Sequence, residues 1–309
     1  MSRERSSRPS AAREGAAADA AALRSCPVCG EGDVADAFAK YDWLVRHCGS
    51  CGLRYRAEPL DRHALPLLYG EDYFTTGGAG YDDYVGESET HLRQARRYLR
   101  FARRLGVRGR RVYDIGCAAG FFLAEARRAG WAAHGCDVSD YAARHAREVL
   151  GLDVEATPFL DAAERPGGYD LVTVFNAFEH LPDPAPAVEK LGRLVRPGGY
   201  LLIETWNADS MVARAFGPRW HQYDPRYVPF YYTRRSLARL FAPADWRLAH
   251  FGRWAKWISV GRAAGIVAHN TPGPLGRGIA RLGRGPLSRV EVPYALGDLV
   301  MAAFQRRPS

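Results

Sequence analysis

Apolar segments of strand length alternate with a segment of helix length in the central part of the chain. Residues 111–115 form a short apolar run that predicts a buried strand, and residues 121–129 predict a helix. Further strands are predicted at residues 131–136 and 169–175. Strands that alternate with helices in this way are typical of an α/β protein.

A long amphipathic helix is predicted before the first of these strands. Residues 88–105 place Leu92, Ala95, Leu99 and Ala102 on one face. A neighbouring stripe holds Arg93, Arg96, Arg97, Arg100, Arg103 and Arg104. Such a stripe either holds phosphate groups or faces solvent, and the sequence favours solvent because no aromatic platform accompanies it.

The turn after residues 111–115 has the spacing of a nucleotide-binding site. Asp114, Gly116 and Gly120 form a D-x-G-x-x-x-G pattern, and Asp137 follows the next predicted strand. Backbone N–H groups at such a strand-to-helix turn allow close approach of a nucleotide-like ligand, and the second acid lies about where a ribose would be.

A nicotinamide-binding Rossmann unit is the competing interpretation of this turn. That unit needs the spacing G-x-G-x-x-G. Ala118 and Phe121 occupy its second and third glycine positions. The sequence therefore disfavours a nicotinamide cofactor, and the segments downstream decide the matter.

Those downstream segments follow in a fixed order. Asp170 lies at the start of the strand at 169–175, residues 176–181 read N-A-F-E-H-L, and residues 196–199 read R-P-G-G, a stop between helix and strand. With the glycine turn, they resemble the motifs of class I S-adenosylmethionine-dependent methyltransferases. The resemblance covers about residues 86–260 and a last strand near residues 298–305.

The resemblance implies the fold. It predicts an α/β protein with a Rossmann-like seven-stranded class I methyltransferase sheet and helices on both faces, within residues 86–309. Two insertions are expected, one at about 206–232, which in this family commonly forms part of the substrate wall, and one at about 261–293. The second is rich in turn residues and is either a lid or a surface decoration.

The resemblance also implies which residues bind S-adenosylmethionine. Asp137 would accept from the ribose hydroxyls, Gly116 and Gly120 would admit the methionine and ribose parts, and Asp161 would accept from the adenine amino group. Asn176 would lie beside the methionine end, while Leu160 and Ala162 would flank the adenine ring. The expected set is Asp114, Gly116, Gly120, Asp137, Leu160, Asp161, Ala162 and Asn176.

Methyl transfer from a sulfonium requires a positioned nucleophile and exclusion of water more than it requires catalytic side chains. A hydroxyl or acidic carbon acceptor would benefit from a base, and the neighbouring pair His180 and Glu179 is the leading candidate. This pair resembles the Glu-His pair that follows the fourth strand in zinc-ribbon C-methyltransferases acting on deoxysugars, and the resemblance implies a catalytic role. The histidine of the same string can also be structural, and His221, Tyr73 and Tyr81 are reserve candidates.

Two Cys-x-x-Cys pairs precede this domain. The pairs, separated by 18 residues, suit a four-thiolate zinc ribbon over residues 25–56. Its expected ligands are Cys26, Cys29, Cys48 and Cys51. Four thiolates leave no open coordination position, so the zinc is expected to be structural. Disulfides are disfavoured because the sequence shows no export signal.

Two further segments flank the ribbon. Residues 1–24 are rich in Ala, Arg and Ser, which predicts a disordered tail and not a secretory signal. Residues 57–85 combine tyrosines with glycines and resemble the segment that follows the zinc ribbon in some bacterial methyltransferases. This connector either caps the cofactor and substrate or packs between ribbon and core.

Composition narrows the function classes. The 309 residues, 47% hydrophobic and 25% charged, suffice for an α/β core with a small accessory module. No apolar stretch reaches membrane-spanning length, and a cytoplasmic protein is expected. The net charge is +9, but all except three of the 43 basic residues are arginine, which resembles the bias of a GC-rich genome more than a nucleic-acid signature.

The sequence therefore predicts an S-adenosylmethionine-dependent methyltransferase acting on an oxygen or carbon nucleophile of a small molecule, such as a sugar, quinone, lipid or secondary metabolite. The alternative is an RNA methyltransferase that holds phosphates with the ribbon and the arginine-rich helix. RNA is less favoured because the ribbon has few cations and little stacking surface. Those cations are Lys40, Arg46, Arg54 and Arg56.

Overall fold

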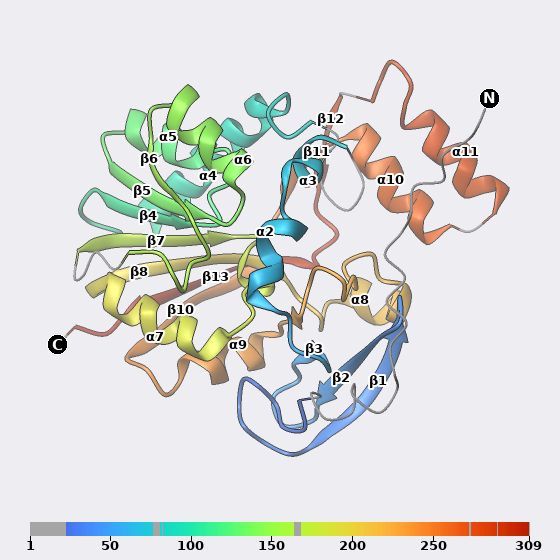
Figure 1. Ribbon diagram of the computed structural model, residues 1–309, viewed down its shortest axis with the longest axis horizontal. Helices are drawn as coiled ribbons and strands as arrows, with labels where there is room; N and C mark the ends of the chain where they lie inside the picture. The colour runs from blue at the N-terminus through green and yellow to red at the C-terminus, as the bar shows by residue number, and fades with distance from the viewer. Residues whose placement is uncertain are drawn as a thin grey trace.

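The computed structural model describes residues 23–76, 81, 83–163, 168–271, 273–288 and 290–308 (Figure 1). The tail expected at residues 1–24 lies outside the described residues except for its last two positions. Of the expected connector, residues 77–80 and 82 also lie outside them.

A seven-stranded mixed sheet forms the centre of the molecule, in the order β10-β13-β8-β7-β4-β5-β6. Its strands are β4 (Arg111–Ile115), β5 (Ala132–Asp137), β6 (Asp153–Ala156), β7 (Tyr169–Phe175), β8 (Val195–Trp206), β10 (Trp246–Arg253) and β13 (Leu299–Arg306). The strands from β6 to β8 are parallel, whereas β13 is antiparallel to both of its neighbours. The expected seven-stranded sheet is confirmed.

Helices cover both faces of this sheet (Figure 1). They are α4 (Ser88–Arg104), α5 (Phe121–Arg128) and α6 (Asp140–Arg144), continued by η2 (His145–Val149), on one face, and α7 (Pro184–Leu194) and α9 (Arg234–Phe241) on the other. Alternate residues of β4 explain the two layers: Val112 packs with the α4 and α5 core, while Tyr113 and Ile115 pack with the α7 and α9 core. The expected apolar face of α4 lies in the first of these cores, through Ala95, Leu99 and Ala102.

The cysteine module forms a second sheet, which is completed by the core. Strands β1 (Val34–Lys40), β2 (Trp43–Cys48) and β3 (Arg54–Arg56) form an antiparallel meander. Strand β9 (Phe230–Tyr231), from the end of the 206–232 insertion, pairs with β3 and closes the sheet order β1-β2-β3-β9. The outer backbone groups of β3 are thereby paired, and the sheet does not end in an open edge there.

The 206–232 insertion also contains α8 (Met211–Phe216) and η4 (Gly217–Arg219). The connector forms η1 (Arg62–Ala64), α2 (Leu65–Leu68) and α3 (Glu71–Thr75). Within it, Leu60, Leu65 and Tyr69 share a small apolar cluster. The connector is therefore packed structure where it is described.

The insertion expected at 261–293 is an ordered unit that begins earlier. Strand β11 (Lys256–Ser259) pairs with β12 (Glu291–Tyr294), and α10 (Val260–Asn270) and α11 (Pro274–Leu282) lie between them. These two helices project from the sheet domain (Figure 1). The sequence did not reveal β11, because a four-residue strand carries little periodicity of its own.

Candidate functional site

A cavity of about 250 Å³ lies at the carboxyl ends of β4, β5 and β7. Open α/β sheets bind ligands at this edge. The strands bring Asp114, Gly116, Asp137 and Asn176 to the cavity wall, although the sequence separates them widely.

The glycine turn depends on left-handed backbone at several positions. Gly116 has φ +69°, and a Cβ atom there would lie 2.6 Å from the Cβ of Ala177. Gly120 has φ +83°, and a Cβ atom there would lie 2.7 Å from Leu152 Cδ1. The lack of a side chain at Gly116 therefore lets the glycine turn lie close to Ala177 in the cavity wall. Gly120 is not among the cavity-lining residues, and its lack of a side chain lets the start of α5 approach Ala146 of η2, while its expected contact with the ligand stays a prediction.

Asp137 fixes this turn and retains capacity for a ligand. Its Oδ2 accepts from the Ala118 amide at 2.7 Å, and its Oδ1 accepts from the Ser139 amide at 2.8 Å. Burial raises the pKa of this carboxyl to about 6, although both amide bonds favour the charged form. A carboxylate has about four acceptor positions, so about two remain for hydroxyl groups.

Asp114 has a more enclosed position. It accepts from Thr173 Oγ1 at 2.6 Å, and burial raises its pKa to about 8. The hydroxyl of Thr173 opposes that rise, and the nearby charge of Asp137 adds to it. Burial therefore favours the neutral form of Asp114, and its bond with Thr173 shapes the turn.

Sequence reasoning missed Glu204, which lies near the end of β8. This fully buried carboxylate accepts from Tyr98 Oη at 2.7 Å and from Asn176 Nδ2 at 2.5 Å. The bond from Tyr98 holds Glu204, and Glu204 in turn orients the side chain of Asn176, whose backbone has φ +50°. An acid inside the apolar run Leu201–Trp206 was the signal that could have identified it, since a buried carboxylate requires partners.

The segment expected around an adenine ring lies only partly in the cavity. Leu160 and Asp161 line it, and Asp161 lies 3.8 Å from the Arg62 guanidinium in an exposed ion pair. Ala162 is instead buried in the core, where its carbonyl accepts from Lys190 Nζ. The tight turn after Pro158 directs Ala162 inward, and its expected place beside an adenine ring stays a prediction.

His180 is held by groups that the sequence did not indicate. Its Nδ1 lies 2.7 Å from Tyr69 Oη and 3.0 Å from the Tyr227 carbonyl oxygen, while Tyr69 Oη donates to the same carbonyl at 3.1 Å. Glu179, expected to orient the ring, bonds Thr205 Oγ1 at 2.9 Å instead. The connector and the 206–232 insertion therefore position the imidazole.

A second cavity, of about 450 Å³, adjoins the first. The two share Tyr73, Tyr81, Glu87, Asn176, His180, Lys256, Ile258 and Arg262. Its other walls come from the 206–232 insertion, through residues such as His221 and Tyr227, and from α10, through residues such as Gly265. His180 and Asn176 thus lie at the junction of two ligand-sized spaces.

Aromatic rings of the connector form one side of the first cavity. Tyr84 stacks on His91 with ring centroids 4.0 Å apart, and His91 stacks on Phe121 at 5.5 Å. Tyr81 packs edge-on against Tyr84 at 4.6 Å. The connector both packs on the core and lines the cavity, and its role as a cap over cofactor and substrate stays a prediction.

The four expected zinc ligands converge. The sulfurs of Cys26 and Cys51 are 3.6 Å apart, as are those of Cys29 and Cys48, and all four lie within 4.8 Å of one another. A zinc–sulfur bond of about 2.3 Å puts the corners of a tetrahedron about 3.8 Å apart. The spacing therefore fits a four-thiolate zinc site, and it is far longer than a disulfide bond.

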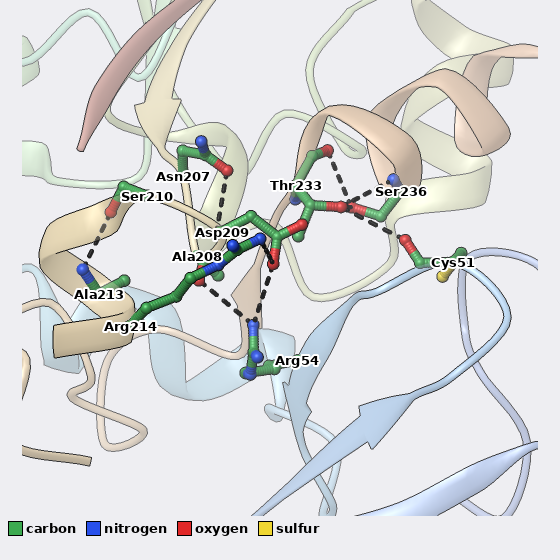
Figure 2. Close-up of polar contacts among 10 residues, drawn as sticks. All are labelled: Cys51, Arg54, Asn207, Ala208, Asp209, Ser210, Ala213, Arg214, Thr233 and Ser236. Atoms are coloured by element: carbon green, nitrogen blue, oxygen red, sulfur yellow. Dashed lines mark hydrogen bonds and ion pairs between the residues drawn. The ribbon is translucent and has the colours of Figure 1, made fainter. Parts of the chain in front are cut away.

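Polar contacts join this module to the start of the 206–232 insertion and to α9 (Figure 2). Thr233 Oγ1 donates to the Cys51 carbonyl at 3.3 Å. Arg54 donates to the Ala208 carbonyl at 3.3 Å and lies 3.8 Å from the Asp209 carboxylate. The backbone of a cysteine ligand is thus tied to the start of α9, and β3 is tied to the start of the insertion whose later residues line the second cavity.

The arginine stripe of α4 is partly used within the molecule. Arg93 pairs with Glu291, Arg96 pairs with Glu125 at 3.1 Å, and Arg97 donates to the Ala255 carbonyl at 2.7 Å. These contacts attach α4 to α5 and to the β11–β12 unit. The stripe is therefore neither a wholly solvated face nor a continuous free basic surface.

A family profile and similar curated proteins both point to methyltransferases. The profile of the family described as "Methyltransferase domain" matches residues 88–250. The ubiquinone biosynthesis O-methyltransferase of Bordetella parapertussis is 36% identical over 92 residues, which are 28% of this chain and 38% of that protein. The enzyme of the same name from Ralstonia nicotianae is 39% identical over 94 residues, 28% of this chain and 39% of that protein. The chain thus spans about two fifths of these relatives.

Solved structures share the fold. The complex between the Trm112 methyltransferase activator and a methyltransferase from Haloferax volcanii contains a chain that matches with a TM-score of 0.52 and 18% identity, over 72% of this chain and 92% of that one. A methyltransferase from Bacillus halodurans matches with a TM-score of 0.50 and 12% identity, over 71% and 99%. No helix in the described part of the chain is both long and apolar enough to cross a bilayer.

Proposed function

Because this chain belongs to the methyltransferase domain family, we propose that it transfers a methyl group from S-adenosylmethionine to an oxygen or carbon nucleophile of a small molecule. The observation that carries the proposal is the junction of two cavities at Asn176 and His180. The cavity at the strand ends would hold the cofactor, and the adjoining cavity would hold the acceptor.

The residues of the first cavity suit this cofactor. Asp137 offers its remaining acceptor positions to the ribose hydroxyls, Gly116 leaves room for backbone approach, and Asn176 lies beside the methionine end. Leu160 and Asp161 provide an apolar contact and an acceptor for the adenine. The bound cofactor supplies the electrophilic methyl group.

His180 is proposed as the base. A carbonyl oxygen only accepts, so we assign the imidazole proton to Nδ1, facing the Tyr227 carbonyl, which would leave a lone pair on Nε2. Burial raises the pKa of Tyr69 well above its usual value, so its hydroxyl stays neutral and holds the ring. The proton of the acceptor nucleophile would pass to Nε2 as the new bond to the methyl carbon forms.

Glu179 is proposed to support this role from beside the histidine. Burial raises its pKa, whereas the neighbouring His180 lowers it. Its Oε1 has no hydrogen-bond partner among the described residues, and its side chain lines the second cavity. A negative charge at this place would stabilise the imidazolium formed during the reaction.

A small molecule is favoured over RNA as the acceptor. The connector, the 206–232 insertion and α10 all contribute walls to the second cavity, and half of the arginine stripe of α4 is engaged in internal contacts. The relatives are named for ubiquinone biosynthesis O-methylation, which supports an oxygen nucleophile. A quinone or phenol is therefore the first class to test, before sugars, other lipids and secondary metabolites.

Label transfer provides the direct test. With methyl-labelled S-adenosylmethionine and a cell extract, we expect label in the small-molecule or lipid-extractable fraction. The variant Asp137→Ala provides the background. Label that entered RNA or protein in preference would contradict the proposal and favour another acceptor.

We also propose that the cysteine cluster holds one structural zinc ion. Elemental analysis of anaerobically purified protein should find one zinc per chain, since four thiolates can contribute roughly 10 kcal/mol or more of coupled binding and folding energy.

Chelation of the zinc should raise hydrogen exchange in residues 25–56 and in the loop at 206–232, while cofactor binding is partly retained. The variant Cys48→Ser should lose the metal, whereas Cys136→Ala, which removes a thiol outside the cluster, should keep it. Protein without zinc, or with a disulfide among these cysteines, would disprove the site.

A further inference from the structure

The segment from Val260 to Val290, which forms α10, α11 and the loop after them, has an unusual composition. It contains five arginines and no aspartate or glutamate, and it also lacks phenylalanine, tyrosine and tryptophan. The rest of the chain mixes both signs of charge. This α10–α11 hairpin is therefore a locally cationic unit without aromatic rings.

The hairpin also exposes large apolar side chains. The exposed fractions are 50% for Val267, 68% for Leu275, 77% for Leu282 and 66% for Leu287. Leu275 and Leu282 are separated by two turns of α11, so they lie on one face of the helix. An exposed apolar face of this kind indicates an interaction surface.

Glycines about a quarter turn around α11 from the leucines face α10. Gly276 is buried, and a Cβ atom on Gly283 would lie 2.6 Å from the Cβ of Ala264 on α10. The two helices therefore pack closely through small residues. Leu275 and Leu282 lie outside this contact, on the exposed surface of α11.

Arginines occupy the other side of the exposed surface of α11 from the leucines. Arg277 and Arg281 are one turn apart on α11, and Arg284 follows the helix. None of the three has an acidic partner among the residues that the structure describes. Their charge is thus available to an external partner, in contrast to Arg93 and Arg96 of α4.

We propose that the α10–α11 hairpin docks the protein onto a bilayer surface that contains anionic lipids. Leucines beside arginines suit the boundary between acyl chains and negatively charged headgroups. A single-stranded nucleic acid would need aromatic stacking surface, which this segment lacks. A second copy of the chain would bring the same unpaired positive charges together, and the whole chain already has a net charge of +9.

The position of the hairpin gives the docking a consequence for the site. Gly261, Arg262, Gly265 and Ile266 of α10 line the second cavity. A docked hairpin would therefore hold that cavity beside the bilayer. Docking itself does not require methyl transfer, so it can be tested separately from the proposed activity.

Vesicle co-sedimentation of the full chain tests the proposal. We expect binding to phosphatidylcholine vesicles that contain about one third phosphatidylglycerol, and at least roughly tenfold weaker binding to phosphatidylcholine alone. The double variant Arg277→Gln and Arg281→Gln should weaken binding roughly 10- to 30-fold, because each arginine near such a surface contributes about 1 kcal/mol. The double variant Leu275→Ser and Leu282→Ser should also release the protein.

Matched controls test whether vesicle binding depends on the hairpin and not on exposed arginines or leucines elsewhere on the surface. Leu67→Ser changes a leucine of α2 that is even more exposed, at 86%, and Arg103→Gln with Arg104→Gln removes two exposed arginines of α4. Both controls should bind vesicles like the parent, and every variant should keep the parent's melting temperature and its affinity for S-adenosylmethionine. Hairpin variants that bind as well as the parent, or a parent that binds neutral vesicles equally well, would overturn the proposal.

Discussion

Replacing Asp137 with alanine should weaken the binding of S-adenosylmethionine by about 100-fold or more. The carboxylate is expected to accept from two ribose hydroxyls, and charge-assisted hydrogen bonds contribute roughly 1.5–3 kcal/mol each. The substitution also removes the acceptor for the Ala118 and Ser139 amides, which fix the turn. Titration calorimetry with the cofactor and its demethylated product measures the loss.

Asp140→Asn is the matched control, because it neutralises an exposed acid three residues further along the chain. It should leave the affinity unchanged. Since burial raises the pKa of Asp137 to about 6, protonation should weaken cofactor binding as the pH falls through that value, in the parent and in the control alike. Parent-like binding by Asp137→Ala would remove the ribose assignment, and preferential binding of a nicotinamide dinucleotide by the parent would contradict the proposed cofactor.

The second large effect is expected for His180→Ala. Loss of a base should lower the turnover rate by about 10²- to 10⁴-fold while cofactor affinity stays nearly constant. Turnover is measured as label transfer to the acceptor fraction that the parent methylates, alongside the melting temperature and the cofactor affinity of the same variant. His63→Ala, at an exposed position on η1, should behave like the parent.

Tyr69→Phe tests how the imidazole is held. The ring of the new side chain keeps its packing, but Nδ1 of His180 loses the hydroxyl 2.7 Å away. A smaller fall in turnover, about tenfold, and a changed pH–rate profile are expected, because the Tyr227 carbonyl still orients the imidazole. If stability and cofactor affinity fell together with turnover in His180→Ala, the histidine would be structural, and His221 would become the next candidate base.

Local patterns were sufficient to predict the fold and part of the site. The spacing of four cysteines predicted a cluster that the structure brings together, because ligands in two tight knuckles are set by short-range geometry. The position of Asp137 followed from the end of a predicted strand. The place of Asp114 beneath the glycine turn followed in the same way, although its partner Thr173 did not.

The contacts that the sequence did not reveal all join distant segments. Tyr98, Asn176 and Glu204 come from a helix, a loop and a strand, and no local pattern connects them. The contact between Tyr69 and His180 depends on how the connector folds over the sheet. Glu179 was assigned to the imidazole from adjacency in sequence, but the short helical turn directs its carboxylate toward Thr205.

The pairing of β9 with β3 has a consequence while the protein is being synthesised, because β9 is made long after β3. A ribosome completes the cysteine knuckles long before it reaches Phe230 and Tyr231. Until then the outer edge of β3 has open hydrogen-bonding groups, and such edges invite pairing with other chains. The nascent module is therefore expected to be most vulnerable to aggregation while the sheet domain is still being synthesised, and early capture of zinc would not by itself remove that exposure.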